Sequence, residues 1–232
     1  MVSNFSDQKI IDSWEKNVEP WVLSVREGEI QSRVLVTNHA IVDVVLAEKP
    51  KTVLDIGCGE GWLVRELAAA GVDTLGIDAI PALIASAEKA GGGRFKVLPI
   101  EHLSSQTLGE TYDALVCNFS LLGKECVDQL FQLAPSLLKE GGSIIVQTVH
   151  PSMGGGEGYE DAWREESWVG FNRQFSDPAP WYFRTLESWV ALFSRADLKF
   201  VSLREPRHPE TGFPVSIIFV GMKVSEHVDI CR

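Results

Sequence analysis

The residues that point most clearly to chemistry are three glycines at alternate positions, Gly57, Gly59 and Gly61, with Asp55 just before them. They follow the apolar run TVLDI, which predicts a strand, and precede WLVRELAAA, which predicts a helix. Glycine at such a turn tolerates positive φ and lets a ligand lie against bare backbone. The free N–H groups of the next helix add hydrogen-bond donors. The run therefore predicts a ligand site at the end of the strand.

The spacing of the glycines separates two ligand classes. A dinucleotide fingerprint needs glycines at its first, third and sixth positions. Counting from Gly57, the sixth position is Trp62, whose indole would obstruct the close helix–strand packing that a pyrophosphate site needs. The spacing therefore favours a ligand without phosphate, including one with an ammonium group that a carboxylate would hold.

The motif VLDIGCGEG resembles the first motif of class I S-adenosylmethionine-dependent methyltransferases. The resemblance covers about residues 50–150, including the run LKEGGSIIVQT, and continues more loosely through the C-terminal hairpin. It implies S-adenosylmethionine as the cofactor. Asp78, 23 residues after Asp55, would accept hydrogen bonds from both ribose hydroxyls, because a carboxylate accepts two O–H donors at once.

The resemblance also implies which other residues contact the cofactor. The glycine turn and Asp55 would lie along its amino-acid end, the end of the second strand along the adenine, and the end of the fourth strand below the sulfonium. The implied contacts are Asp55, Gly57, Cys58, Gly59, Asp78, Ala79, Ile80, Ile100, Glu101, Asn118, Phe119 and Arg33.

Two of these contacts have alternatives. Arg33 would reach the methionine carboxylate, but a helix-surface ion pair with Glu29, four residues earlier, is the plainer interpretation. Where the family often places an acid and a small residue against the adenine, this chain has LPIE. Because Pro99 offers no side-chain acceptor, the adenine amino group needs another partner, for which Glu101 is the candidate.

His150 is the candidate catalytic residue. It follows the fifth predicted strand, SIIVQTV, at the sheet edge where ligands of open α/β sheets bind. An imidazole there would deprotonate or orient a hydroxyl or amine acceptor; the alternative is a histidine that caps the strand end. No spacing of His, Cys, Asp or Glu indicates a metal site.

Short apolar runs alternate with helical patterns around these motifs, which implies right-handed crossovers and parallel strands. We expect an α/β fold with a Rossmann-like, doubly wound, seven-stranded sheet that is mostly parallel, has helices on both faces and ends in an antiparallel C-terminal hairpin strand. We expect an N-terminal helical cap of two or so helices over residues 1–48 and a methyltransferase domain over 49–232. Within it, about residues 151–182 are rich in Gly, Trp, Phe and acids and are interpreted as a substrate-lid insertion, most of whose aromatic side chains form its own small core.

Composition narrows the function further. The 32 acidic and 21 basic residues give a formal charge of −11, which disfavours nucleic acid as a partner. Four scattered cysteines, no recognisable signal sequence and no long apolar run favour a cytoplasmic protein without membrane contact. We expect a methyltransferase acting on an O or N atom of a small molecule. The alternatives are an NAD(P)-dependent oxidoreductase, a non-catalytic S-adenosylmethionine-binding protein, or a different reaction with the same cofactor; the oligomeric state stays open.

Overall fold

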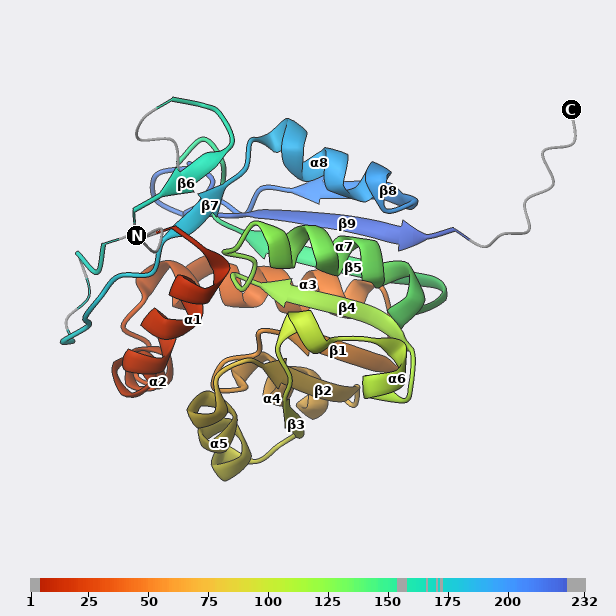
Figure 1. Cartoon of the computed structure of the whole chain (residues 1–232), viewed down its shortest axis with the longest axis horizontal. Coiled ribbons are helices and arrows are strands. Elements are labelled where there is room, and N and C mark those ends of the chain that lie inside the picture. The colour runs from red at the N-terminus through yellow and green to blue at the C-terminus, as the bar shows by residue number, and fades with distance from the viewer. Residues whose placement is uncertain (1–4, 154–157, 166, 170, 172, 225–232) are drawn as a thin grey trace, which may run out of the picture.

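A computed structural model describes residues 5–153, 158–165, 167–169, 171 and 173–224. Its main sheet has seven strands in the order β3-β2-β1-β4-β5-β9-β8 (Figure 1). The strands are β1 (Thr52–Ile56), β2 (Asp73–Asp78), β3 (Arg94–Val97), β4 (Tyr112–Asn118), β5 (Leu138–Thr148), β8 (Leu198–Arg204) and β9 (Ile217–Lys223). β9 runs antiparallel to both β5 and β8, whereas the pairs from β3 through β5 are parallel. The predicted seven-stranded sheet with an antiparallel C-terminal hairpin is therefore confirmed.

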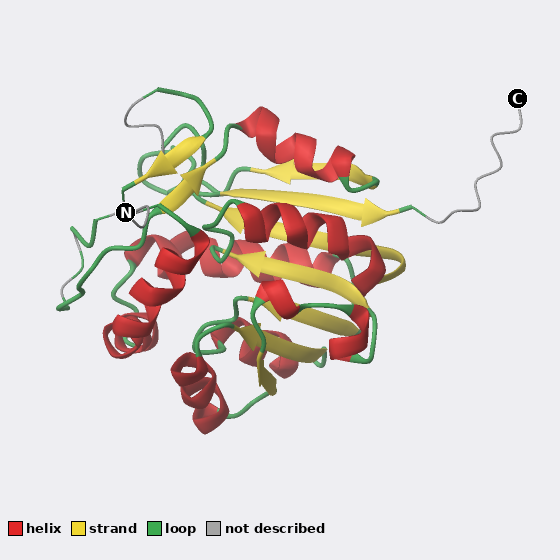
Figure 2. Cartoon of the chain, viewed as in Figure 1, coloured by secondary structure: helices red, strands yellow, loops and turns green. Residues whose placement is uncertain are grey.

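Helices cover both faces of this sheet (Figure 2). On one face Leu115, Ile144 and Phe219 share a core with α7 (Glu125–Leu137) and α8 (Leu186–Arg195). On the other, Val116 and Ile145 share a core with α3 (Asn38–Ala47) and α4 (Trp62–Ala69). α5 (Pro81–Ala90) follows β2, and a single 3₁₀ turn (Ile100–His102) and α6 (Ser105–Leu108) lie between β3 and β4. The chain order reverses at β1 and β4, and ligands of such sheets bind at the carboxyl ends of the strands at this point.

The N-terminal segment divides between two layers. α1 (Asp7–Lys16) and α2 (Val18–Arg26) stand at the carboxyl edge of the sheet (Figure 1), where Val22 packs with Ile80 and Leu83. A π-helical turn, Arg33–Thr37, then leads into α3, which packs on the sheet itself. Of the predicted cap over residues 1–48, α1 and α2 thus cover the edge and α3 belongs to the helical layer.

The insertion after β5 carries a two-stranded antiparallel pair, β6 (Ala162–Arg164) and β7 (Trp181–Phe183). Its aromatic rings contact one another, as expected from the sequence: Trp168 stacks on Phe175 with ring centroids 4.5 Å apart, and Trp163 meets Tyr182 at 5.5 Å. The described residues contain no helix with the length and apolar character required to cross a membrane.

Candidate functional site

A cavity lies at the carboxyl edge of the sheet, beneath α1 and α2. Its walls come from the turn after β1, the ends of β2 and β4, the 3₁₀ turn after β3, and the two N-terminal helices. Eleven of the twelve predicted cofactor contacts line it: Arg33, Gly57, Cys58, Gly59, Asp78, Ala79, Ile80, Ile100, Glu101, Asn118 and Phe119.

The glycine turn needs glycine for steric reasons. Gly57 has φ of +75°, and a Cβ built on it would lie 2.4 Å from the Cβ of Ser120. Gly61 has φ of +82°, and its Cβ would lie 2.6 Å from the ring of Phe95. The N–H groups of Gly57 and Cys58 both donate to the carbonyl of Ile77, at 2.8 and 2.9 Å. The turn is thus held tightly against β2, with its backbone open to the cavity.

Asp78 ends β2 and faces the turn. One carboxylate oxygen accepts the N–H of Gly59 and the other that of Ile80, each at 2.9 Å. Burial raises the pKa of Asp78, while these N–H donors oppose the rise. Since a carboxylate has about four lone-pair sites, one on each oxygen remains to accept a hydroxyl group in the cavity.

Asp55 lies on β1 below the turn and does not line the cavity. It is 2% exposed, and within the described part of the chain it has no hydrogen-bond or ion-pair partner. Burial, with the charge of Asp78 as a second cause, raises its pKa to about 8. Asp55 and Asp78 together make the floor of the site favour a positively charged group.

Arg33 begins the π-helical turn and supplies the positive charge of the cavity. Its guanidinium lies 5.2 Å from the ring centre of Trp62 and 5.6 Å from that of Trp21. Burial lowers its pKa to about 10, and the charge of Glu60 opposes this change, so Arg33 stays charged at neutral pH. Within the described residues its guanidinium has no carboxylate in ion-pair contact, which leaves it available to a ligand carboxylate.

The ion pair between Glu29 and Arg33 that the sequence favoured does not form, so that interpretation is wrong. Glu29 instead pairs with Arg173 of the insertion at 2.8 Å and accepts a hydrogen bond from Ser24 at 2.8 Å. Glu29 precedes the helical residues, which begin at residue 31, so the helical spacing of four residues does not apply, and Arg173 takes the carboxylate.

Trp14 and Trp21 both line the cavity and also pack on each other with ring centroids 4.9 Å apart. Ile10, Ile11 and Val25 complete this part of the wall. α1 and α2 therefore form an apolar roof over the site.

Two acidic residues that the sequence analysis missed fasten this roof. Glu60, 1% exposed, accepts hydrogen bonds from Arg26 of α2 and from Arg65, each at 2.7 Å. Asp7 of α1 accepts the N–H groups of Lys124 and Cys126 at the start of α7, at 2.8 and 2.7 Å. The second contact has a sequence signal, because an acid suits a helix N-terminus, but its helix lies more than 100 residues away.

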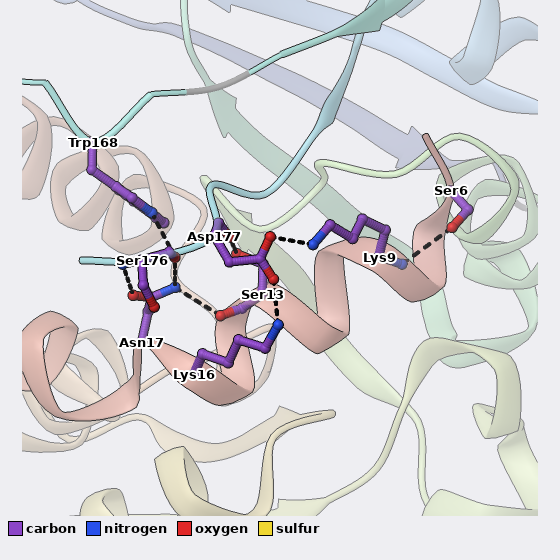
Figure 3. A network of polar contacts seen from close by, with 8 residues as sticks. All are labelled: Ser6, Lys9, Ser13, Lys16, Asn17, Trp168, Ser176 and Asp177. Atoms are coloured by element: carbon purple, nitrogen blue, oxygen red, sulfur yellow. Dashed lines mark hydrogen bonds and ion pairs between the residues drawn. The ribbon is translucent and has the colours of Figure 1, made fainter. Parts of the chain in front are cut away.

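The insertion fastens the roof from outside (Figure 3). Asp177 pairs with Lys9 and Lys16 of α1, and Ser176 exchanges hydrogen bonds with Asn17, at 2.9 and 2.7 Å. No described residue between 151 and 182 lines the cavity. The insertion thus contacts α1 and Asn17 and not the cavity itself. Its direct contact with a substrate stays a prediction.

His150 is not brought to the cavity. Its Nδ1 lies 2.6 Å from the hydroxyl of Ser152, and its Nε2 lies 2.9 Å from a carboxylate oxygen of Glu205. Both ring nitrogens are therefore engaged at the end of β5, which agrees with the alternative of a capping histidine. A catalytic role for His150 stays a prediction.

The family model described as a methyltransferase domain matches residues 31–203. The chain belongs to this methyltransferase family. A ubiquinone biosynthesis O-methyltransferase of Acinetobacter baumannii (strain ACICU) is 31% identical over 106 residues, which make up 43% of this chain and 44% of that protein. One from Bordetella avium is 29% identical over 105 residues, 43% of each chain. The chain thus aligns with less than half the length of these curated relatives.

Solved methyltransferase structures share the fold. An S-adenosylmethionine-dependent methyltransferase from Mesorhizobium loti has a TM-score of 0.59 at 19% identity and covers 79% of this chain and 96% of its own. The 1,6-didemethyltoxoflavin-N1-methyltransferase of Burkholderia thailandensis has a TM-score of 0.62 at 16% identity and covers 94% of this chain and 87% of its own. At these identities the likeness establishes the Rossmann-like fold that the sequence predicted.

Proposed function

We propose that this chain is an S-adenosylmethionine-dependent methyltransferase that methylates an oxygen or nitrogen atom of a small molecule. The observation that carries the proposal is the placing of Arg33 and Asp78 on one cavity, joined by the bare backbone of the glycine turn. Family membership and the eleven converging contact residues support it.

The side chains in and below the cavity fit this cofactor. Arg33, whose Nε donates to Asn38 Oδ1 at 3.3 Å, has no ion-pair partner within the described residues and can offer its terminal nitrogens to the amino-acid carboxylate. Asp55, below the turn, has no positive partner among those residues, and an ammonium group would supply one. Asp78 keeps two lone-pair sites for the ribose hydroxyls. Ile80, Leu98 and Ile100 give apolar walls suited to adenine. Trp62 stands where the dinucleotide fingerprint has its third glycine and lines the cavity, which argues against the oxidoreductase alternative.

The cofactor supplies a methyl group activated by a sulfonium. The chain's contribution is to align and desolvate the acceptor, and such positioning accounts for several kcal/mol of many reaction barriers. Arg33 and Asp78 hold the two ends of the ligand, and the roof of α1 and α2 excludes water. A base such as His150 is needed only where the acceptor's proton has a high pKa.

Three observations favour a small-molecule acceptor. The net charge of −11 repels nucleic acid. The curated relatives are named for O-methylation in ubiquinone biosynthesis, and the Burkholderia enzyme is described with a bound small molecule.

We place the protein in the cytoplasm. The cysteines in the described residues are free thiols, and Cys58 and Cys117 are buried; reduced cysteines are typical of that compartment.

Isothermal titration calorimetry with S-adenosylhomocysteine and with NADH tests the proposal. We expect micromolar affinity for S-adenosylhomocysteine and no measurable heat from NADH. Tight NADH binding without S-adenosylhomocysteine binding would reverse the assignment. Formation of S-adenosylhomocysteine from S-adenosylmethionine with a metabolite panel then separates an enzyme from a non-catalytic binder.

A further inference from the structure

A second group of polar side chains, three of them buried and Asn118 half-buried, lies at the same edge of the sheet. It comprises Thr37 before α3, Asn118 of β4, Gln147 of β5 and Ser216 before β9. Thr37 is 2% exposed, Gln147 is 1% exposed and Ser216 is fully buried. Within the part of the chain that the structure describes, the oxygens Thr37 Oγ1, Asn118 Oδ1 and Gln147 Oε1 have no hydrogen-bond partner. Buried polar atoms are almost always paired, so three unpaired oxygens in one region indicate a missing partner.

Asn118 and Gln147 are neighbours that face the same way. They are paired residues in the register of β4 and β5. Residues two positions earlier, Val116 and Ile145, lie in the core beneath α3. Because side chains alternate along a strand, Asn118 and Gln147 point to that same face. The amide nitrogen of Gln147 donates to Ser216 Oγ at 2.9 Å, which leaves its amide oxygen unpaired.

Thr37 reaches the same level from the helix side. α3 runs antiparallel to β5, since Glu48 after α3 accepts a hydrogen bond from Ser143 near the start of the parallel part of β5, at 3.2 Å. Eleven helical residues back to Thr37 span about 16 Å, and four strand residues from Ser143 to Gln147 span about 13 Å. Ile41, one turn after Thr37, is buried in the core between α3 and the sheet, so Thr37 faces the sheet at about the level of Gln147.

Asn118 joins this group to the ligand cavity, because it also lines that cavity. The chain turns sharply after it: Phe119 has φ of +54°, and its N–H donates to the carbonyl of Gln147 at 2.8 Å. Backbone strain of this kind persists where surrounding structure enforces it, often at functional sites. Asn118 thus brings one of the three unpaired oxygens to the cavity, and Gln147, its neighbour on β5, lies directly behind it without lining the cavity itself.

We infer that Thr37, Asn118 and Gln147 form the polar end of the acceptor subsite, and that the acceptor is an uncharged molecule with hydroxyl or amino hydrogens. This inference rests on the proposed function. Asn118 Oδ1 and Gln147 Oε1 can only accept hydrogen bonds, so they select donors.

The charges along the cavity support an uncharged acceptor. Arg33 is the one cation among its described lining residues, and the cofactor's carboxylate takes it, so an anionic acceptor has no partner. A protonated amine has no lone pair to attack. Methyl transfer forms a bond from the acceptor's lone pair to carbon, leaves the carbon–sulfur electron pair on sulfur, and releases the acceptor's proton to water.

Catechol is a suitable probe, because its adjacent hydroxyls can reach oxygens on neighbouring strands about 5 Å apart. 1,2-Dimethoxybenzene has the same ring without the donor hydrogens. Calorimetry on protein saturated with S-adenosylhomocysteine should show binding of catechol and none of the ether. Gln147→Met and Thr37→Val should each weaken catechol binding at least tenfold. The matched control is Thr74→Val, a buried threonine of β2 whose hydroxyl donates to the carbonyl of Val72; it should leave binding unchanged.

Three results would overturn the inference: no catechol binding to the loaded protein, equal binding of both compounds, or unchanged binding in Gln147→Met and Thr37→Val. Failure of S-adenosylhomocysteine itself to bind would instead refute the proposed function. If Gln147→Met does not fold, Thr37→Val and a crystal structure of the loaded protein with catechol decide the question. A catechol hydroxyl bonded to Gln147 Oε1 supports the inference, and ordered water alone in the pocket contradicts it.

Discussion

Asp55 makes the free energy of unfolding depend on pH in the opposite sense to a paired surface carboxylate. Burial and the charge of Asp78 raise its pKa to about 8 in the folded protein, whereas an unfolded aspartate ionises near pH 4. Between these values the folded state holds a proton that the unfolded state has lost. The free energy of unfolding therefore falls as pH rises through this window.

Asp55→Asn removes this dependence while keeping the size of the side chain. A full proton difference changes the free energy of unfolding by about 1.4 kcal/mol per pH unit. Over about four units the upper bound is about 5.6 kcal/mol, which is comparable to the whole stability of many domains. The pKa values of Asp113 and Asp177 are lowered by their hydrogen-bond and ion-pair partners. These two residues contribute equally to the unmodified protein and to Asp55→Asn, so their effect cancels when the two free energies of unfolding are subtracted.

Urea unfolding at pH 5, 6, 7 and 8, at constant ionic strength and followed by tryptophan fluorescence, measures this difference. We expect Asp55→Asn to gain stability relative to the unmodified protein as pH rises, by about 1 kcal/mol per unit. Saturating S-adenosylhomocysteine should reduce the gain, because its ammonium group favours ionised Asp55. A difference that stays constant from pH 5 to 8 would refute the argument that Asp55 is buried without a partner.

Four further variants test other parts of the site. Asp78→Ala should weaken S-adenosylhomocysteine binding about 100-fold by calorimetry, or about 3 kcal/mol, through loss of two charge-assisted hydrogen bonds; unchanged affinity removes its ribose role. Arg33→Met should weaken S-adenosylhomocysteine at least tenfold yet spare 5′-methylthioadenosine, which lacks the amino-acid end; equal losses contradict a carboxylate contact. Gly57→Ala should cost about 2–4 kcal/mol in urea unfolding, because its Cβ would lie 2.4 Å from that of Ser120; unaltered stability would count against the tight turn. Asp177→Asn should speed S-adenosylhomocysteine dissociation in stopped-flow fluorescence by releasing two lysines of α1, and an unaltered rate would show that the insertion does not hold the roof.

The framework of the site was predictable because its signals are local. β1 was predicted at Thr52–Ile56 and forms there, since an unbroken apolar run before a glycine turn suits a strand buried on both faces. The positive φ at Gly57 and Gly59 is likewise a property of the chain at those positions. The mostly parallel character of the sheet followed from the alternation of strands and helices, whereas the strand order came only from the structure.

The partners of charged residues were decided by the tertiary structure. Glu29 and Arg33 have the spacing of a helical ion pair, but such a pair contributes only about 0.2–0.5 kcal/mol, so packing overrides it. In the fold Glu29 meets Arg173, while Arg33 lies between two tryptophans.

The roof of α1 and α2 shows the same contrast between features that local sequence predicts and contacts that only the fold creates. The helix after β1 and the bare glycine turn before it were predictable, because these depend on residues close together in the chain. The tertiary structure decided that Asp7 caps α7 and that Glu60 bonds to Arg26. The unpaired oxygens of Asn118 and Gln147 also became evident only there. Such contacts join residues far apart in the chain, and their approach is set by how the crossovers pack, which no local pattern encodes.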